Sequence, residues 1–187
     1  MNFINSKKVL LSSLILVVGL CGVNVLGAIA GTFSIREISA QITRRTNVPI
    51  LLPSEEVVEQ NKFDASETIY AHLINSSEYD YHVIFDKAPR FSNNAVFRFS
   101  ISAKRGGDFE IRSQDSNPRY SPVFSKVKVH DNSNALVTSW CGGTACWSTV
   151  QWKSNGVLYK VWSKRRPPNT ALAIANSAMR EGNRSKR

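Results

Sequence analysis

The sequence predicts an α+β fold, in which an antiparallel β-sheet built from hairpins is covered by one C-terminal α-helix. Short runs rich in β-branched and aromatic residues alternate with turn-forming clusters, as is typical of antiparallel strands. An alanine-rich stretch at residues 170–180 follows two prolines, and Asn169 or Thr170 can cap a helix there. At 187 residues, the chain has the length of one domain, or of two at most.

The first 30 residues have the three parts of a secretory signal. Lys7 and Lys8 form a basic segment, residues 9–20 are dominated by Val, Leu and Ile, and residues 28–30 (Ala-Ile-Ala) fit a cleavage pattern. The alternative is a retained membrane anchor, because residues 9–30 would be about 33 Å long as a helix and could cross a bilayer. Both interpretations place the rest of the chain outside the cytoplasm, as a secreted, periplasmic or membrane-anchored protein.

The remaining chain divides into three expected parts. Residues 31–47 are polar and are expected to be a linker, residues 48–180 to be a single domain, and residues 181–187 to be a flexible basic tail. Residues 48–53 read Val-Pro-Ile-Leu-Leu-Pro. Because a residue before proline is pushed toward extended backbone, we expect this segment to be a strap over the core or an edge strand.

The part of the domain before residue 135 contains four expected strands and one further candidate. They are residues 68–74, 79–85, 95–103 and 124–130, with residues 108–112 as the further candidate. Successive side chains of a strand point to opposite faces. In the third strand, Phe97, Phe99 and Ile101 are therefore expected on one side, opposite Arg98 and Ser100.

Residues 135–164 predict three strands nearly residue by residue. The pair Asn155-Gly156 is a strong signal for a type I′ hairpin turn, because both turn positions require positive φ. This turn pairs Trp152 with Tyr159 across the hairpin.

The strand before this hairpin is fixed by two cysteines. Cys141 and Cys146 enclose a four-residue loop, which places Trp140 opposite Trp147. The alternation then divides the side chains between two faces of the sheet. Face A is small and apolar, suits the core, and carries Ala135, Val137, Ser139, Cys141, Cys146, Ser148, Val150, Trp152, Tyr159, Val161 and Ser163. Face B carries Leu136, Thr138, Trp140, Trp147, Thr149, Gln151, Lys160, Trp162 and Lys164.

Face B is the candidate binding surface, because it combines three of the four tryptophans with lysines. Two lysines of the preceding strand belong to the same candidate set, which is Trp140, Trp147, Trp162, Lys160, Lys164, Lys126 and Lys128. Tryptophan can stack on sugar rings or lie at a membrane interface, and lysine can bind phosphate or carboxylate. The alternative is that the C-terminal helix or the strap covers these tryptophans, since large aromatic side chains fill cores more often than they bind ligands.

Cys141 and Cys146 are the cysteines that remain if a signal containing Cys21 is removed. An even number of cysteines in an exported chain favours a disulfide, which for so short a loop contributes about 2 kcal/mol at most. The alternative is a thiol–disulfide redox centre. Redox proteins favour Cys-x-x-Cys at a helix N-terminus, whereas this pair has four intervening residues in a β context. No metal site is expected, because no histidine lies within ten residues of the pair.

Charge is distributed unevenly along the chain. Residues 31–115 carry a net charge of −2, whereas residues 116–187 contain twelve Lys or Arg and two acidic residues. Outside the cytoplasm, such a basic region would meet anionic lipid, acidic glycan or an acidic envelope protein rather than nucleic acid. The alternative is that the charge serves solubility alone. Because the usual hydrolase, metalloprotease, phosphate-binding and dinucleotide-binding motifs are absent from the sequence, we expect neither an enzyme nor a cofactor.

The C-terminal third resembles a group of bacterial proteins. A strand pair of the form Trp152-x3-Gly156-x2-Tyr159 follows the two cysteines and precedes the alanine-rich segment at residues 172–177. This pattern, with the start at residues 48–53, resembles uncharacterised secreted or lipid-attached bacterial proteins, some of them cyanobacterial, and the extracytoplasmic domains of anti-sigma-factor-like proteins. The resemblance implies an envelope protein with a sheet backed by a C-terminal helix, and it implies no catalytic residue.

The leading hypothesis is a non-catalytic binding or structural module of the bacterial envelope. It combines the export signal, the basic C-terminal region and the lack of a catalytic motif. Two alternatives from other classes are an envelope enzyme acting through the cysteine pair and a sensor domain anchored in the membrane by residues 9–30.

Overall fold

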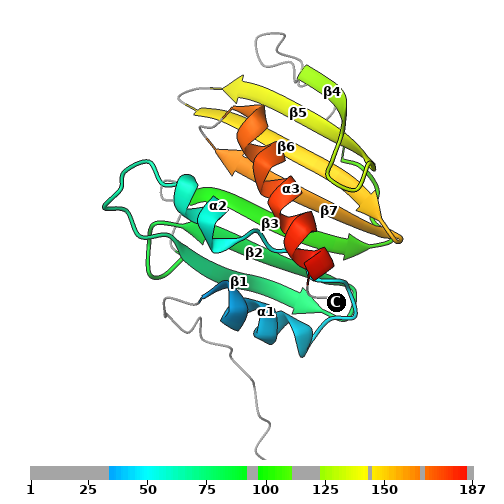
Figure 1. The fold of residues 1–187 in the computed structure, drawn as a ribbon, viewed down its shortest axis with the longest axis horizontal. Helices are drawn as coiled ribbons and strands as arrows, with labels where there is room; N and C mark the ends of the chain where they lie inside the picture. The colour runs from blue at the N-terminus through cyan, green and yellow to red at the C-terminus, as the bar shows by residue number, and fades with distance from the viewer. Residues whose placement is uncertain (1–33, 92–96, 111–122, 143–144, 165–166, 185–187) are drawn as a thin grey trace, which may run out of the picture.

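The expected α+β architecture is confirmed. A computed structural model describes residues 34–91, 97–110, 123–142, 145–164 and 167–184. These residues form a seven-stranded antiparallel sheet with the order β1-β2-β3-β7-β6-β5-β4, and helices pack against it (Figure 1). The strands are β1 (Tyr70–Ser77), β2 (Asp80–Asp86), β3 (Phe97–Arg105), β4 (Val123–Lys128), β5 (Asn134–Gly142), β6 (Ala145–Ser154) and β7 (Val157–Lys164). The helices are α1 (Ile35–Thr43), α2 (Glu55–Gln60) and α3 (Pro168–Arg184).

The order of the strands follows from two meanders. Strands β1 to β3 pair consecutively, the chain then crosses to the far edge, and β4 to β7 return until β7 pairs with β3. The predicted hairpin turn is present, with φ of 51° at Asn155 and 73° at Gly156. The predicted pairs Trp152–Tyr159, Trp140–Trp147 and Cys141–Cys146 are all confirmed.

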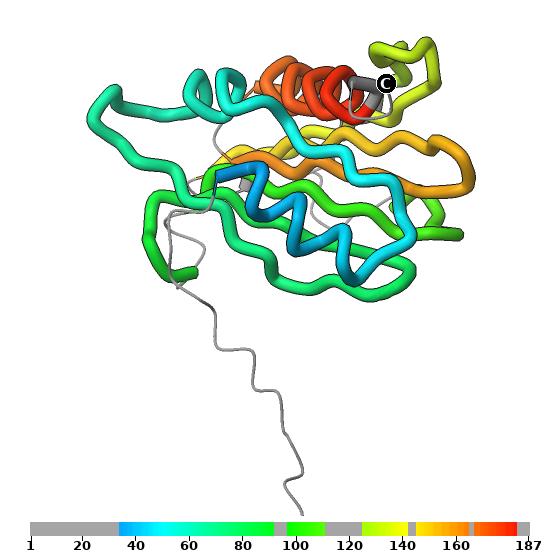
Figure 2. Tube along the Cα trace, turned by 60° about the horizontal axis from the view of Figure 1, so that its bottom comes forward, coloured from blue at the N-terminus to red at the C-terminus, as the bar shows by residue number. Residues whose placement is uncertain are grey.

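Face A extends over the whole sheet and forms the core. Val83, Ile101, Val161 and Val150 lie side by side on four successive strands, and each is 0% exposed. Trp152, also 0% exposed, stacks on Tyr159 with 5.3 Å between the ring centroids. Helix α3 covers this face at β5, β6 and β7 (Figures 1 and 2). Three alanines on its inner face, Ala171, Ala175 and Ala178, allow this close approach, and Ile174, Ser177 and Met179 are buried beside them.

Residues 48–53 form the expected strap over the core. The Tyr81 hydroxyl, on face A of β2, accepts a hydrogen bond from the Leu51 amide (2.9 Å) and donates one to the Leu51 carbonyl (3.2 Å). The Tyr159 hydroxyl donates to the Pro49 carbonyl (3.0 Å). Burial raises the pKa of Tyr159 to about 12 and raises that of Tyr81 still further, so both hydroxyls remain neutral anchors for the strap. In Figure 2 the strap lies on the same side of the sheet as α3.

The expectation of a linker at residues 31–47 is wrong for residues 35–43, which form α1. Ser34 caps this helix with Glu37 in a capping box, and Ile38 and Ile42 are buried in the core. The expected flexible tail is likewise wrong for its first residues, because α3 extends to Arg184 and Gly182 packs against Leu51.

Two details of the sheet also differ from expectation. Residues 108–110 are not a strand. In β3, a register shift next to Phe85 places Phe97, rather than Arg98, opposite Asp86. Such a bulge moves one side chain to the other face of the sheet. Phe97 therefore contacts the tryptophans of face B instead of joining Phe99 in the core.

Among the residues that the structure describes, no helix is long and apolar enough to cross a membrane. The expected signal or anchor, residues 1–30, lies outside the described residues.

Candidate binding site on face B

Face B is the side of the sheet opposite α3 and the strap. The alternative that either of these elements covers the tryptophans is wrong, because both pack against residues of face A. Trp140, Trp147 and Trp162 are each half-buried. They are therefore neither core residues like Trp152 nor fully exposed.

The aromatic side chains of face B form a continuous row across β3, β7, β6 and β5. The ring centroids of Phe97 and Trp162 lie 5.0 Å apart, those of Trp162 and Trp147 lie 4.7 Å apart, and those of Trp147 and Trp140 lie 6.5 Å apart. The last two pairs are stacked, with interplanar angles of 21° and 19°. The Lys164 ammonium lies 5.0 Å from the centre of the Trp147 ring, in a cation–π contact.

A pocket of about 200 Å³ adjoins this aromatic row. Thr138, Thr149 and Gln151 are buried and belong to neighbouring strands, and together they form the polar part of its lining. Trp140 and Trp162 supply the aromatic part, and Lys160 and Glu110 supply a charged pair. The pocket therefore presents flat apolar surface and hydrogen-bonding groups to the same small volume.

The segment after β3 brings Glu110 onto face B. Gly106 adopts a φ of +68°, a conformation that favours glycine, and directs the chain across the sheet. The Gln151 side chain then accepts a hydrogen bond from the Glu110 amide (2.8 Å) and donates one to the Glu110 carbonyl (2.9 Å). These two bonds fix the backbone of Glu110, while its carboxylate pairs with Lys160. The expected strand at residues 108–112 is thus replaced, over its described part, by a crossing that lines the pocket.

Two residues that line the pocket each carry a buried polar atom without a hydrogen-bond partner among the described residues. These atoms are the Thr138 hydroxyl, on a residue that is 5% exposed, and the indole Nε1 of Trp162. Buried polar atoms are bonded in the great majority of cases, so an unbonded pair at the same pocket needs an explanation.

The predicted lysines occupy three different environments. Lys160 is paired with Glu110, and Lys164 lies over Trp147. Lys126 and Lys128 are exposed on β4, at the edge of the sheet, and the register places Lys126 beside Leu136 of face B. The structure therefore brings Lys160 into the pocket and Lys164 onto the aromatic row, and leaves the two β4 lysines beside them.

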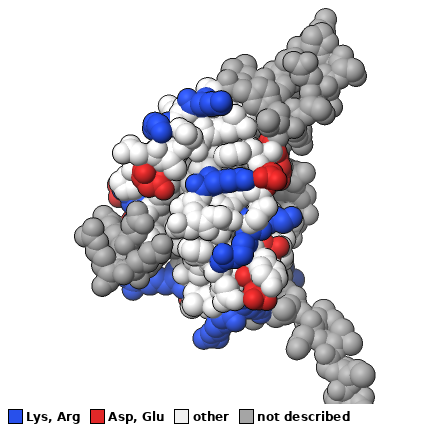
Figure 3. Space-filling model, turned by 90° about the vertical axis from the view of Figure 1, so that its right-hand side faces the viewer, with Lys and Arg blue, Asp and Glu red and all other residues white. Residues whose placement is uncertain are grey.

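On at least one side of the molecule, basic residues do not form a continuous patch. On the side that faces right in Figure 1, Lys and Arg side chains alternate with Asp and Glu side chains (Figure 3). The side shown in Figure 3 is therefore not uniformly basic. Face B differs from it in that its lysines lie beside the aromatic row.

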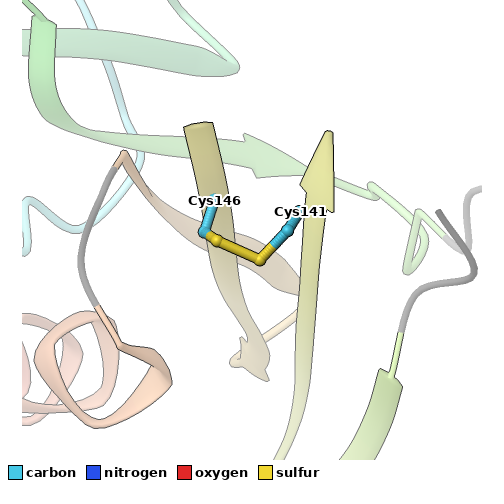
Figure 4. The surroundings of a disulfide bond; sticks show 2 residues. All are labelled: Cys141 and Cys146. Atoms are coloured by element: carbon cyan, nitrogen blue, oxygen red, sulfur yellow. A yellow bond between two sulfur atoms is a disulfide. The ribbon is translucent and has the colours of Figure 1, made fainter. Parts of the chain in front are cut away.

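The expected disulfide is present in the structure. Cys141 and Cys146 are exposed, lie opposite each other on β5 and β6, and are joined by a bond between their sulfur atoms (Figure 4). The adjacent register pair is Trp140–Trp147, so the disulfide holds the two strands together at the end of the aromatic row.

His82 lies in the row of side chains that contains the charged pair. It is opposite Ser102, which is in turn opposite Lys160. Burial, and secondly the positive charge of Lys160, lower the pKa of His82. His82 is therefore a neutral donor or acceptor at neutral pH rather than an additional cation.

A second cluster of ionisable residues lies near the other edge of the sheet. His72 Nε2 is 3.2 Å from the buried Asp86 carboxylate and 3.0 Å from the Ala88 carbonyl, and Asp86 also accepts a bond from the Ala88 amide (2.8 Å). These contacts fix the chain after β2, which indicates a structural role. No group of three potential metal ligands is found among the described residues.

Arg98 and Glu67 form a further ion pair, with Phe63 stacked beneath the guanidinium at 4.2 Å. Burial acts to raise the pKa of Glu67, but the hydrogen bond from Arg98, the hydrogen bond from the Phe63 amide and the charge of Arg98 together outweigh it, so that the pKa is lowered and the pair remains ionised. The Glu67 carboxylate also accepts a hydrogen bond from the Phe63 amide (2.8 Å), so the pair connects residues 63–67 to β3.

Sequence reasoning identified the tryptophans and Lys160 but missed four other contributors to the site. Thr138, Thr149 and Gln151 were placed on face B without being singled out, and Glu110 was not considered. A polar side chain at a central position of a predicted sheet indicates a candidate site residue, because burying a polar group without a hydrogen-bond partner is costly.

Comparison with known proteins adds no identity: no family model, no curated protein and no solved structure matches this chain. The fold and the site define it as an antiparallel α+β domain with one face covered by helices and a pocket beside an aromatic row on the other.

Proposed function

We propose that this chain is a non-catalytic binding module that acts outside the cytoplasm and holds an acidic polysaccharide on face B. The observation that carries the proposal is the pocket in which two tryptophans, three buried polar side chains and a lysine meet. The non-polar C–H surface of a sugar ring packs well on an indole, and its hydroxyls suit threonine and glutamine side chains.

The lysines favour an acidic ligand. Lys126 and Lys164 lie on either side of the β5–β6 hairpin, so a chain crossing the pocket passes near both. Charges placed around a site increase the rate of association and make binding dependent on salt. The extracytoplasmic location rests on the signal-like sequence of residues 1–30 and agrees with a disulfide, which persists in oxidising compartments.

A membrane surface is the less favoured partner. A phosphate head group usually requires several cations or backbone amides, whereas a carboxylate can pair with a single lysine, and Lys160 is the one lysine among the described residues that line the pocket.

The experiment is a binding titration of the full chain, in mild detergent, with a polyuronate such as alginate at low and at moderate salt. Binding that weakens as salt rises is expected. Lys126→Glu and Lys164→Glu should each weaken binding about two- to fivefold, as expected for exposed charges.

Arg180→Glu is the matched control, because it makes the same charge change on the exposed surface of α3. Its effect should be clearly smaller than that of either lysine variant. Equal effects of all three variants would mean that only net charge matters, and the absence of any salt-sensitive binding to polyuronates would refute the proposal.

A further inference from the structure

We infer that the face B pocket is a subsite for a single acidic sugar ring, with the Thr138 hydroxyl and the Trp162 indole N–H as its hydrogen-bonding groups. This inference rests on the proposed function and specifies which residues select the ligand. We call this volume the ring pocket; it is lined by Glu110, Thr138, Trp140, Thr149, Gln151, Lys160 and Trp162.

The first argument is the pair of unpartnered polar atoms. Thr138 is 5% exposed, and neither its hydroxyl nor the Trp162 Nε1 has a hydrogen-bond partner among the described residues. A threonine in this position gains nothing for the fold over a valine of the same shape, which would avoid burying a hydroxyl. A ligand hydroxyl or carboxylate in the pocket would accept a hydrogen bond from the Trp162 indole N–H and form a second hydrogen bond with the Thr138 hydroxyl.

The second argument is the size and polarity of the ring pocket. Its volume of about 200 Å³ is several times the share of one water molecule and is below the range typical of drug-sized ligands. The lining alternates aromatic and hydrogen-bonding groups, so it matches a ligand with one apolar surface and a polar edge. One sugar ring has this size and this distribution of polarity.

The third argument is the charged pair at the edge of the ring pocket. The Lys160 side chain is 28% exposed and its partner carboxylate, Glu110, is 65% exposed. The Glu110 backbone is held by Gln151, so its side chain can move away without displacing the segment. A ligand carboxylate can therefore replace Glu110 on Lys160, and Glu110 acts as an internal competitor for it.

Three substitutions test these roles: Thr138→Val and Glu110→Gln keep the shape of the side chain, and Trp162→Phe keeps an aromatic ring while removing the indole N–H. Thr138→Val and Trp162→Phe remove the unpartnered groups, and each should weaken binding of defined uronate trisaccharides, taken as a panel of glucuronate, galacturonate and mannuronate oligomers, by about three- to tenfold. Glu110→Gln removes the competitor and should strengthen binding of the same oligomers about two- to fivefold. It should leave a neutral trisaccharide of galactose unaffected.

Ser163→Ala is the matched control. The Ser163 hydroxyl is also buried and unpartnered among the described residues, but it lies on face A, on the side of the sheet away from the pocket. This variant should leave the affinity for every oligomer unchanged. Thermal unfolding checks all variants, and Thr138→Val should be at least as stable as the wild type, which separates lost binding from lost folding.

The outcomes distinguish the ring pocket from the proposed function. If alginate binds in a salt-sensitive manner but Thr138→Val, Trp162→Phe and Glu110→Gln all bind as the wild type does, the ring pocket is refuted and the proposed function stands. If no uronate ligand binds at all, both fail. If anionic phospholipid vesicles bind and Trp162→Phe weakens that binding, the ring pocket takes a head group and the assignment to a sugar is wrong.

Discussion

The two faces of the sheet are made by the same strands but serve different purposes. On face A, four aliphatic side chains of successive strands are 0% exposed and lie under α3 and the strap. On face B, the positions between them carry Trp162, Thr149 and Thr138, which pair across β7, β6 and β5. Because strand side chains alternate with a period of two, one set can stabilise the fold while the other is free to bind a ligand.

The largest expected effect concerns the two tryptophans of β6. Trp152→Ala should lower the free energy of unfolding by about 3–5 kcal/mol, because it leaves a cavity in a fully buried site. Trp147→Ala, on face B, should cost about 1–2 kcal/mol, because the residue is half-buried and loses its contacts with neighbouring rings and with Lys164 without leaving a closed cavity. Urea denaturation followed by far-UV circular dichroism measures both, and equal losses would mean that the two faces do not differ as described.

The disulfide should have a smaller effect on the fold. Replacing Cys141 and Cys146 together by serine should lower the free energy of unfolding by about 2 kcal/mol at most, because the closed loop is short. The change should also loosen the Trp140–Trp147 contact, measurable as faster amide exchange in residues 139–148. A loss well above that value, or uniform loosening of the sheet, would contradict a purely local role.

His82 should give a small dependence of stability on pH. Its folded pKa lies below the ordinary value of 6.5, because burial, and secondly Lys160, disfavour the protonated ring. As the pH falls, the unfolded chain binds a proton at His82 before the folded protein does. The contribution of neutral His82 to the free energy of unfolding is therefore fully present above pH 6.5 and is lost as the pH falls through the folded pKa. His82→Gln should flatten the wild-type stability curve in this range, and chemical denaturation between pH 7.5 and 5 compares the two proteins. An unchanged slope would mean that His82 is not the group responsible.

The smallest expected effect is on redox activity. The cysteine pair lies between two strands and is not at a helix N-terminus, where a thiolate would be stabilised. We therefore expect wild type and Cys146→Ser to reduce insulin disulfides at the same background rate. A wild-type rate well above that of the variant would favour the redox alternative.

Local signals explain which parts of the fold were predictable. The pair Asn155-Gly156 and the two cysteines lie within their own hairpins, so they determine the register of β5, β6 and β7 without knowledge of the rest of the chain. The start of α1 was also readable in principle, because Ser34 and Glu37 have capping-box spacing before Ile38 and Ile42. The overall polarity of residues 31–47 obscured it.

The candidate site was predictable only in part, because half of it depends on distant contacts. The tryptophans and Lys160 follow from strand alternation. Glu110, however, reaches its position through hydrogen bonds to Gln151, 41 residues away, and through the turn at Gly106. Phe97 joins the aromatic row because of a bulge against β2, and such register shifts depend on the pairing of strands rather than on their own sequence.

The most direct test of the account is a crystal structure of the protein with a uronate trisaccharide. The account predicts one sugar ring in the pocket between Trp140 and Trp162, with its carboxylate on Lys160, the Glu110 side chain moved aside, and a polar ligand atom within hydrogen-bond distance of both Thr138 Oγ1 and Trp162 Nε1. A trisaccharide bound elsewhere on the surface, with this pocket holding water alone, would contradict it.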